Sequence, residues 1–375
     1  MQQFTEVTIE WTQSTFIFYL AIILGCYLIA VMVRNTNIRL VIRERYPANL
    51  FLITIILLFV KCFNTTGADV RGGYAFNFSL ATSMAAYYDK TVEIGWQFLM
   101  VVINNLTGNY FVFLFVVGLL TVFPVIHFIY KYRKKINVPA AVILYTGIYF
   151  INSFSACRQY LSVSLSLFAF DAIIEKKSLK ALFWIAVSSL FHVSCLLLII
   201  PYFLSFFRQL SKKMIAFSAI LFLALFYLSR GSIASLLADH DRYKIYFISD
   251  EVHFGFEQIV YYTPLFFLLY LCRKDRANRY FSRVVYIYLV TGFLFGMCSY
   301  ILPIFGRLQP VFMPIIIFIP YYIKWYKDHH YSKTKKTLLN MVVVFYAAAR
   351  FVIWIVQYYN GEDLMPYTNM FGKII

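Results

Sequence analysis

Several arginines lie in or beside long apolar stretches, where a permanently charged guanidinium is costly. Arg158 and Arg307 each begin an apolar stretch, and Arg350 lies inside another one. An ionisable side chain at membrane depth usually lines a wet cavity or binds a ligand. Because the planar guanidinium matches the geometry of phosphate oxygens, a group of arginines around one cavity indicates a ligand that carries phosphate.

Further side chains are suited to proton transfer near such a ligand. His192 lies in the middle of the apolar segment 181–207, and Asp69 and Glu93 lie in the more polar segment 64–95. A histidine or a carboxylate within reach of an attacking hydroxyl can act as its general base. Ordinary alternatives stay open. Arginines near the ends of membrane spans can reach lipid headgroups or pair with acidic residues. A histidine in the core can form a hydrogen bond to the backbone, and carboxylates in loops are commonly just solvated.

The composition indicates that these residues belong to an integral membrane protein. Of the 375 residues, 61% are hydrophobic and 14% are charged. The runs 15–33, 109–130 and 337–356 are each long enough to cross a hydrocarbon layer about 30 Å thick. A net charge of +17 would suggest nucleic acid in a soluble protein, but the basic residues here fall in short clusters between apolar runs. We therefore expect a lipid bilayer and no nucleic acid as partner, and an all-α polytopic membrane protein with one integral domain over residues 1–375.

Clusters of basic residues set the direction in which the chain is threaded. They lie at 34–45, 131–135, 175–180, 208–213, 272–279 and 324–336. Short basic loops stay on the cytoplasmic side, so all of these clusters are predicted to lie inside. The loops 64–95 and 230–257 and both termini are then outside. The same side holds Asp69, Arg71, Glu93, Arg158 and Arg307.

Two segments do not fit simple membrane hairpins. Only one crossing is allowed between the outer loop and the inner cluster at 131–135, so residues 93–106 are predicted to form a short helix on the outer face. Segment 181–207 has basic flanks at both ends and is therefore predicted to be a pair of short helices that meet near His192. With these two exceptions, the threading gives about ten transmembrane helices.

The cysteines and acidic clusters do not indicate a metal site or a cofactor. Six cysteines are scattered singly, so free thiols are expected and no zinc site is predicted. The stretch Asp239-His240-Asp241, with His253 downstream, lacks a fixed ligand spacing. We expect neither a metal nor a cofactor.

The central part of the chain resembles a known family. The stretch "CRQYLSVSLSLFAFDAIIEKKSLKALFWIAVSSLFHVS", residues 157–194, is similar to the signature of EpsG-like, Wzy-type polysaccharide polymerases. In that signature an Arg–Gln pair opens a span, a basic turn follows, and a Phe–His pair ends the next short helix. Four outlying pieces agree: "TGADVRGGY", "EIGWQFL", "GRLQPVFMPIIIFIP" and "MPYTNMF". One departure is that Tyr74 comes one residue later than is usual in the family.

The resemblance implies a glycosyltransferase of the bacterial inner membrane that works on the periplasmic side. Such an enzyme joins oligosaccharide repeat units, carried on undecaprenyl diphosphate, into O-antigen, capsule or exopolysaccharide. Its fold would be like that of the metal-independent GT-C glycosyltransferases. The growing chain leaves its lipid diphosphate and is transferred to a hydroxyl on the next unit.

Glycosyl transfer of this kind needs cations for the departing diphosphate and a base for the attacking hydroxyl. The candidate catalytic residues are His192, Asp69 and Glu93. The candidate diphosphate-binding residues are Arg158, Arg307 and Arg350. The candidate substrate-binding residues are Gln159, Arg71, Tyr74, Arg242 and Tyr243.

Two other functions fit parts of the sequence. A transporter or flippase of lipid-linked oligosaccharides would also need a basic cavity, but such carriers often have broken helices in corresponding halves, and the sequence predicts only one, at 181–207. A membrane acyltransferase would usually place its histidine with cytoplasmic residues that bind the donor. The sequence does not specify the sugar or the linkage, and it leaves open whether a partner protein controls chain length.

Overall fold

The computed structural model describes most of the chain and shows it to be helical. The described residues are 9–32, 37–39, 45–71, 73–85, 92–207, 211–238, 255–272, 275, 278–329 and 332–371. Among them, regular strands occur only in a short antiparallel hairpin of β1 (Asn37–Arg39) and β2 (Arg45–Pro47). The expected all-α architecture is confirmed apart from this hairpin.

Among the described residues, five helical segments are long and apolar enough to cross a membrane. They are α1 (Gln13–Met32), α6 (Tyr110–Tyr132), α14 (Arg279–Cys298), the run Pro303–His329 and α16 (Lys333–Tyr358). A sixth candidate joins α11 (Lys212–Leu228) to the following Arg230–Leu236, with a bend of 66° between them. The chain therefore has the character of a polytopic membrane protein, and the number of about ten spans stays a prediction.

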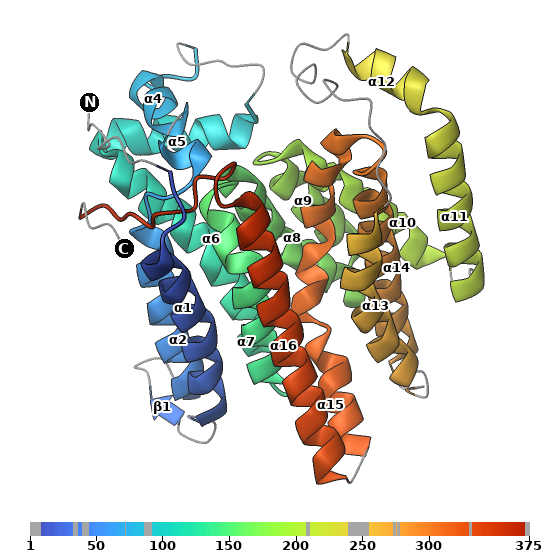
Figure 1. Cartoon of the computed structure of the whole chain (residues 1–375). Coiled ribbons are helices and arrows are strands. Elements are labelled where there is room, and N and C mark those ends of the chain that lie inside the picture. The colour runs from blue at the N-terminus through green and yellow to red at the C-terminus, as the bar shows by residue number, and fades with distance from the viewer. Residues whose placement is uncertain are drawn as a thin grey trace.

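The remaining helices are shorter. They are α2 (Ala48–Cys62), α3 (Ala68–Arg71), α4 (Gly73–Leu80), α5 (Ile94–Thr107), α7 (Val138–Tyr145), α8 (Cys157–Ile174), α9 (Ser178–Ser189), α10 (Ile199–Phe206), α12 (Arg230–Ala238) and α13 (Phe256–Leu271). Helix α15 (Pro320–His329) is the last part of the run Pro303–His329. Most of the larger helices lie side by side along one direction, whereas α4, α5 and α12 lie at the upper end (Figure 1).

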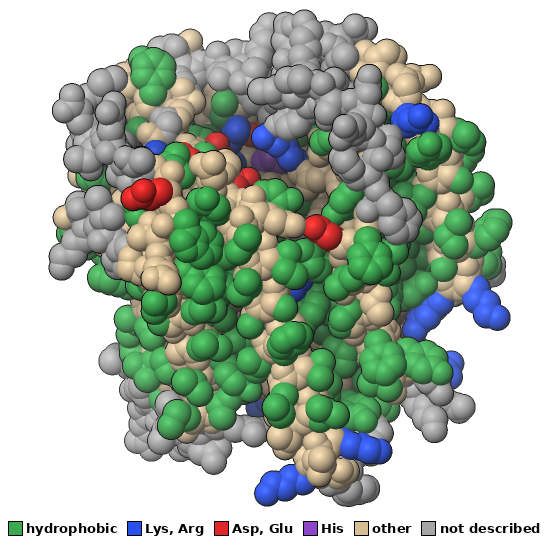
Figure 2. All heavy atoms as spheres, viewed as in Figure 1, with side chains coloured by type: hydrophobic (Ala, Val, Ile, Leu, Met, Phe, Trp, Pro, Cys, Tyr) green, Lys and Arg blue, Asp and Glu red, His purple; other side chains and the backbone are tan. Residues whose placement is uncertain are grey.

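The outward-facing side chains support a lipid environment. Phe123, Phe217 and Phe345 expose 60%, 67% and 75% of their surface, which would be unfavourable in water. Hydrophobic side chains cover most of the middle of the face seen in Figure 2, and charged side chains lie mainly above and below it. The interior is packed with aromatic rings such as Tyr145, Phe170 and Phe318, which are fully buried.

Both exceptional segments take the predicted form. Helix α5 crosses the upper end of the bundle at a steep angle to α6 (Figure 1). In segment 181–207 the helix α9 ends at Ser189, and His192, in an extended conformation, precedes the 3-10 helix η3 (Val193–Leu198), which continues into α10. The break at His192 is therefore confirmed.

The two arms of this broken segment return to the same end of the bundle. The Tyr280 hydroxyl donates to the carbonyl of Ile173, just before α9, at 3.0 Å. The Arg283 guanidinium, one turn further along α14, donates to the carbonyl of Leu204 in α10 at 3.3 Å. Since the end of α8, which leads into α9, and the second arm α10 both contact the first turns of α14, the segment is a hairpin, called here the re-entrant hairpin, whose tip carries His192.

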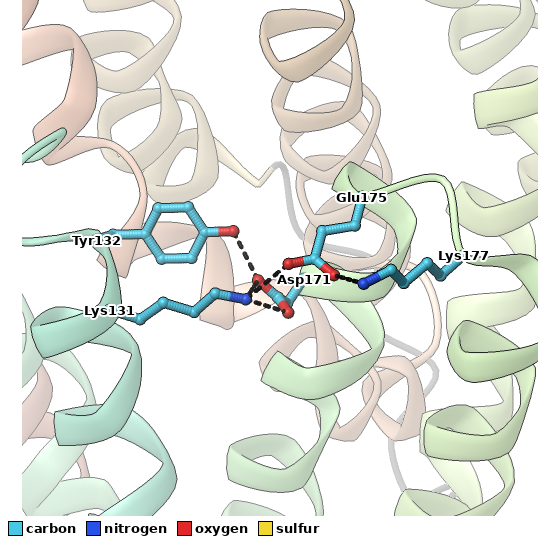
Figure 3. Close-up of polar contacts among 5 residues, drawn as sticks. All are labelled: Lys131, Tyr132, Asp171, Glu175 and Lys177. Carbon is cyan, nitrogen blue, oxygen red and sulfur yellow. Dashed lines mark hydrogen bonds and ion pairs between the residues drawn. The ribbon is translucent and has the colours of Figure 1, made fainter.

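A cluster of ionic contacts joins α6 to α8 at the lower end. Lys131 Nζ contacts Asp171 Oδ1 at 2.6 Å and Glu175 Oε1 at 2.8 Å, and the Tyr132 hydroxyl also donates to Asp171 (Figure 3). Hydrogen bonds from Lys131 and Lys177 lower the pKa of Glu175 to about 2. Because Asp171 is almost fully buried, this cluster fixes the lower end of α8, the helix whose other end carries Arg158.

Candidate functional site

The candidate site begins where the helix preceding Arg158 loses its regular hydrogen bonding. Helix α7 passes into a π-helix (Thr146–Phe150) and then a 3-10 turn (Ile151–Phe154) before α8 begins at Cys157. The intervening "NSFSA" is rich in small polar residues, which compete with the helical backbone for hydrogen bonds. Arg158 therefore projects from the first turn of a new helix at the upper end of the bundle.

Two neighbours fix this break in place. Lys61 of α2 is buried, and its Nζ donates to the Ser153 carbonyl and lies 3.6 Å from the Cys157 sulfur. Gly67 approaches the backbone of Phe154 so closely that a Cβ would collide with it, and its φ of +116° is one that favours glycine. The first outer loop thus rests directly on the start of α8.

Arg158 is held by residues from two outer segments. Its Nε donates to the Tyr74 hydroxyl at 3.0 Å and its Nη1 to Glu93 Oε2 at 3.0 Å. The Tyr74 hydroxyl in turn donates to Asp69 Oδ2 at 2.7 Å. The Arg158 side chain is 22% exposed and that of Glu93 is 7% exposed. The chain of contacts Asp69–Tyr74–Arg158–Glu93, which we call the arginine cradle, therefore unites four of the predicted site residues.

The tip of the re-entrant hairpin reaches the same cradle. The Gly95 amide donates to the Leu190 carbonyl at 2.8 Å, and the Val193 amide lies 3.4 Å from Glu93 Oε1. A side chain at Gly95 would collide with Leu190, so this close approach requires glycine. His192 is half-buried beside the cradle, with Nδ1 2.6 Å from the Ser194 hydroxyl.

Arg307 lies beside the first turn of α8, the turn that carries Arg158. The amide of Gln159 donates to the Arg307 carbonyl, which holds the 3-10 helix η5 (Pro303–Arg307) against the first turn of α8. The Gln159 side chain thus positions Arg307, and its expected contact with substrate stays a prediction.

Arg350 lies deeper than the other arginines and is surrounded by tyrosines. Its guanidinium lies 3.4 Å from the centre of the Tyr261 ring, which is a cation–π contact. The Nη1 atom is buried without a hydrogen-bond partner among the described residues. Tyr160, next to Gln159, lies within electrostatic range of Arg350 and of Glu362. The structure therefore places Arg350 at the floor of the same region.

Arg71 contacts the C-terminal tail. Its Nη2 donates to the Pro366 carbonyl at 2.7 Å and lies 3.2 Å from the Thr368 hydroxyl. Thr65 also bonds to Thr368, through both backbone and side chain. The tail and the first outer loop therefore form one unit. Arg71 Nε and Nη1 are buried without a hydrogen-bond partner among the described residues, and the binding of substrate by Arg71 stays a prediction.

Sequence reasoning missed one acidic residue, Glu362. It follows the last long helix, is half-buried, interacts with Ser155 beside the helix break, and lies within electrostatic range of Asp69 and Arg307. Burial raises the pKa of its carboxyl above the ordinary value. An acidic residue just after an apolar span, on the side already rich in arginine, was the available signal.

Some predicted residues lie outside the part of the chain that the structure describes. These are Arg242 and Tyr243, and also Asp239, His240, Asp241 and His253. Within the described ranges, no three His, Cys, Asp or Glu side chains are placed to hold a metal ion. All six cysteines are free and buried, as expected.

The assembled site combines cations, carboxylates and an imidazole at one end of the bundle. Acidic, basic and histidine side chains are visible together around a recess near the upper end of the face in Figure 2. Hydrogen bonds to described residues engage two of the five N–H groups of Arg158, so the others can contact an anion. Such a site can bind a phosphate-bearing group and place a proton acceptor beside it.

Comparison with known proteins gives one match. A family model described as the EpsG family matches residues 48–369, a range that includes every member of the arginine cradle as well as His192, Arg307, Arg350 and Glu362. No curated protein and no solved structure matches the chain.

Proposed function

Because the chain belongs to the EpsG family, a family of Wzy-like polysaccharide polymerases, we propose that it joins oligosaccharide repeat units carried on undecaprenyl diphosphate into a surface polysaccharide. The reaction takes place at the end of the bundle that holds the arginine cradle, which we assign to the periplasmic side of the bacterial inner membrane. The opposite end carries the basic clusters, and short basic loops remain cytoplasmic. A GT-C-like fold remains part of this proposal.

The cradle carries the proposal because it preorganises Arg158 for a departing diphosphate. During transfer, the bond between the anomeric carbon of the donor and its diphosphate oxygen breaks, and negative charge grows on that oxygen. Fixed cations stabilise such charge without having to reorient. Glu93 and Tyr74 hold Arg158 in place, and Arg307 and Arg350 supply further positive charge from neighbouring helices.

His192 is the proposed general base. The acceptor hydroxyl forms the new bond to the anomeric carbon and gives its proton to the imidazole, while the lipid diphosphate leaves. His192 lies at the tip of a hairpin that touches the cradle, so it can reach a sugar bound over Arg158. Glu93 and Asp69 were expected to be catalytic, but their contacts with Arg158 and Tyr74 suit them better to positioning these side chains.

An apolar cavity below Arg350 suits the polyprenyl chain of the donor. It has a volume of about 360 Å³ and lies between α13, α15 and α16, with Leu268, Val343 and Tyr346 in its wall. The Tyr346 hydroxyl donates to the carbonyl of Tyr261, whose ring lies against Arg350. A lipid with its diphosphate near Arg350 could therefore place part of its chain in this cavity.

One structural observation favours the alternative function, a transporter of lipid-linked oligosaccharides. The sequence predicts a single broken helix, but the described residues contain irregular helices in both halves, at Thr146–Phe154 and at Gln309–Ile317. Both segments contact α8. Broken helices in both halves are typical of transporters, so the test must separate transport from polymerisation.

The test is reconstitution of the purified full-length protein in liposomes with lipid-linked repeat units. A polymerase produces a ladder of longer saccharides, which requires no movement of lipid between leaflets. A carrier moves the lipid-linked unit across the bilayer and leaves its length unchanged. The polymerase proposal is refuted if the wild-type protein moves the lipid but yields no product longer than one repeat.

A further inference from the structure

A second polar cavity lies at the opposite end of the bundle from the arginine cradle. It has a volume of about 520 Å³ and is bordered by the end of α1, the start of α2, the α6–α7 turn and the α15–α16 turn. This volume lies in the range of small-molecule sites and is far larger than a single bound ion needs. No role in the proposed reaction uses this cavity.

Its lining is strongly basic. The cationic side chains are Arg133, Lys324, Lys327, Lys333 and Lys336, and the acidic one is Asp328. Five positive charges against one negative give a local excess of four. All of these cations except Lys333 are half-buried, whereas Asp328 is exposed. A partly desolvated cation is unfavourable unless an anion lies beside it.

The described part of the protein supplies no such anion for most of these cations. The ion pairs among described residues are those of Lys131, Lys177 and Arg158, so none includes Arg133, Lys324, Lys333 or Lys336. Arg133 donates to the carbonyl of Tyr130 and lies 3.8 Å from the centre of its ring, which leaves other N–H groups of the guanidinium for a ligand.

The cations that line this cavity are arranged more specifically than a general excess of basic residues in cytoplasmic loops would require. Lys324 and Lys327 are three residues apart on α15, and Lys333 and Lys336 are three apart on α16, so each pair shares one helix face. Both faces line the same cavity, together with Arg133 from a distant part of the chain.

Neutral groups in the wall complete a site for a polar ligand. Asn340 accepts a hydrogen bond from Lys327, and Asn137 caps the first turn of α7 through its side chain. The hydroxyl of Thr337 also lines the cavity and can donate to an oxygen. Lysine, arginine and hydroxyl donors around one hollow form a typical environment for phosphate oxygens.

We propose that this cavity binds the phosphate group of an anionic ligand. The shared chemistry is a phosphate that accepts hydrogen bonds from α15, α16 and the α6–α7 turn. It can come from the headgroup of an anionic phospholipid or from a soluble phosphate compound. Binding would tie the α6–α7 turn to the α15–α16 turn, and the proposal does not depend on the polymerase reaction.

The test uses the full-length protein in detergent and two probes. Native mass spectrometry measures retained phosphatidylglycerol, with phosphatidylcholine as a zwitterionic comparison, and calorimetry measures inorganic pyrophosphate. Each lysine near an anionic group contributes roughly fivefold in affinity, so Lys324→Gln with Lys336→Gln should weaken binding about 25-fold. Lys324→Arg with Lys336→Arg should retain it within about threefold.

The matched control is Lys134→Gln with Lys135→Gln, which removes the same charge from exposed residues beside Arg133 that do not line the cavity. This variant should bind within about threefold of wild type, since exposed charges contribute little. Binding of phosphatidylglycerol alone assigns the site to a lipid headgroup, and binding of pyrophosphate assigns it to a soluble ligand. The proposal is overturned if neither probe binds or if both glutamine pairs weaken binding equally.

Discussion

Replacing Arg158 tests the proposed mechanism most directly, because its geometry is fixed on two sides. Its guanidinium bridges Tyr74 and Glu93 through different nitrogens, each at 3.0 Å. A lysine at this position keeps the charge, but its single ammonium cannot reproduce the planar, two-pronged arrangement. An alanine removes both the charge and the cation that pairs with Glu93, whose side chain is only 7% exposed.

The expected size of each effect follows from the interactions that the substitution removes. A hydrogen bond that involves a charged group contributes about 1.5–3 kcal/mol, so Arg158→Lys should slow chain extension roughly ten- to a hundredfold. Loss of a preorganised donor to developing charge costs about 3–4 kcal/mol. Arg158→Ala should therefore slow turnover roughly a hundred- to a thousandfold.

The assay is the rate of saccharide extension in liposomes at saturating lipid-linked substrate, normalised to folded protein. Arg230→Ala is the matched control, because Arg230 lies at the start of α12 and its guanidinium contacts only nearby Tyr227 among the described residues. That variant should retain turnover within about threefold, as expected of an arginine that stabilises no reacting charge.

A double-mutant cycle tests whether Glu93 acts through Arg158. Glu93→Gln should lower turnover about tenfold in the wild type but less than about threefold in the Arg158→Lys protein, because coupled residues are not additive. Normal turnover in the Arg158→Ala protein would refute the diphosphate role of Arg158. An equal effect of Glu93→Gln in both backgrounds would show that Glu93 does not work through Arg158.

Three further predictions concern stability, pH and backbone packing. Asp171→Asn should destabilise the protein by about 1.5 kcal/mol, seen as a lower thermal midpoint, because it weakens the charged hydrogen bond to Lys131, which keeps its ion pair with Glu175; an unchanged midpoint would contradict this. Burial raises the pKa of Glu362, so its contribution to stability is present at acidic pH and lost as pH rises through that pKa. Glu362→Gln should therefore raise the thermal midpoint at pH 7 and leave it near the wild-type value at pH 4, and a lower midpoint at pH 7 would count against it. Gly95→Ala should separate the hairpin tip at Leu190 from α5, so that turnover falls clearly while the thermal midpoint changes little. Wild-type turnover in this variant would show that the close approach is dispensable.

Much of the architecture could be predicted from the sequence because it follows from local patterns. The preference of basic loops for the cytoplasmic side and the length of the apolar spans were enough to predict that Arg158 and Arg307 lie at one end and the basic clusters at the other. The break at His192 followed from basic residues on both flanks of one apolar segment. These arguments need only the position of a residue along the chain.

The contacts of the site could not be predicted in the same way, because they join residues that are distant in sequence. The cradle pairs Arg158 with Tyr74 and Glu93, 84 and 65 residues away. Arg71 was expected to bind substrate, but its partner lies 295 residues later, in the tail. The π-helix before Arg158 likewise depends on tertiary neighbours and not on propensity alone.

The contact between the tail and the first outer loop constrains the order in which the site can form during synthesis. Ribosomes make the chain from its N-terminus, so residues 64–71 reach the membrane long before residues 362–370, to which they bond. Until those later residues arrive, the loop that carries Asp69 lacks its support. A nascent chain that stops before Glu362 would therefore insert most of its helices without forming a finished site. Activity would then appear only after residues 362–370 have been made, so that shorter polypeptides do not consume lipid-linked sugar.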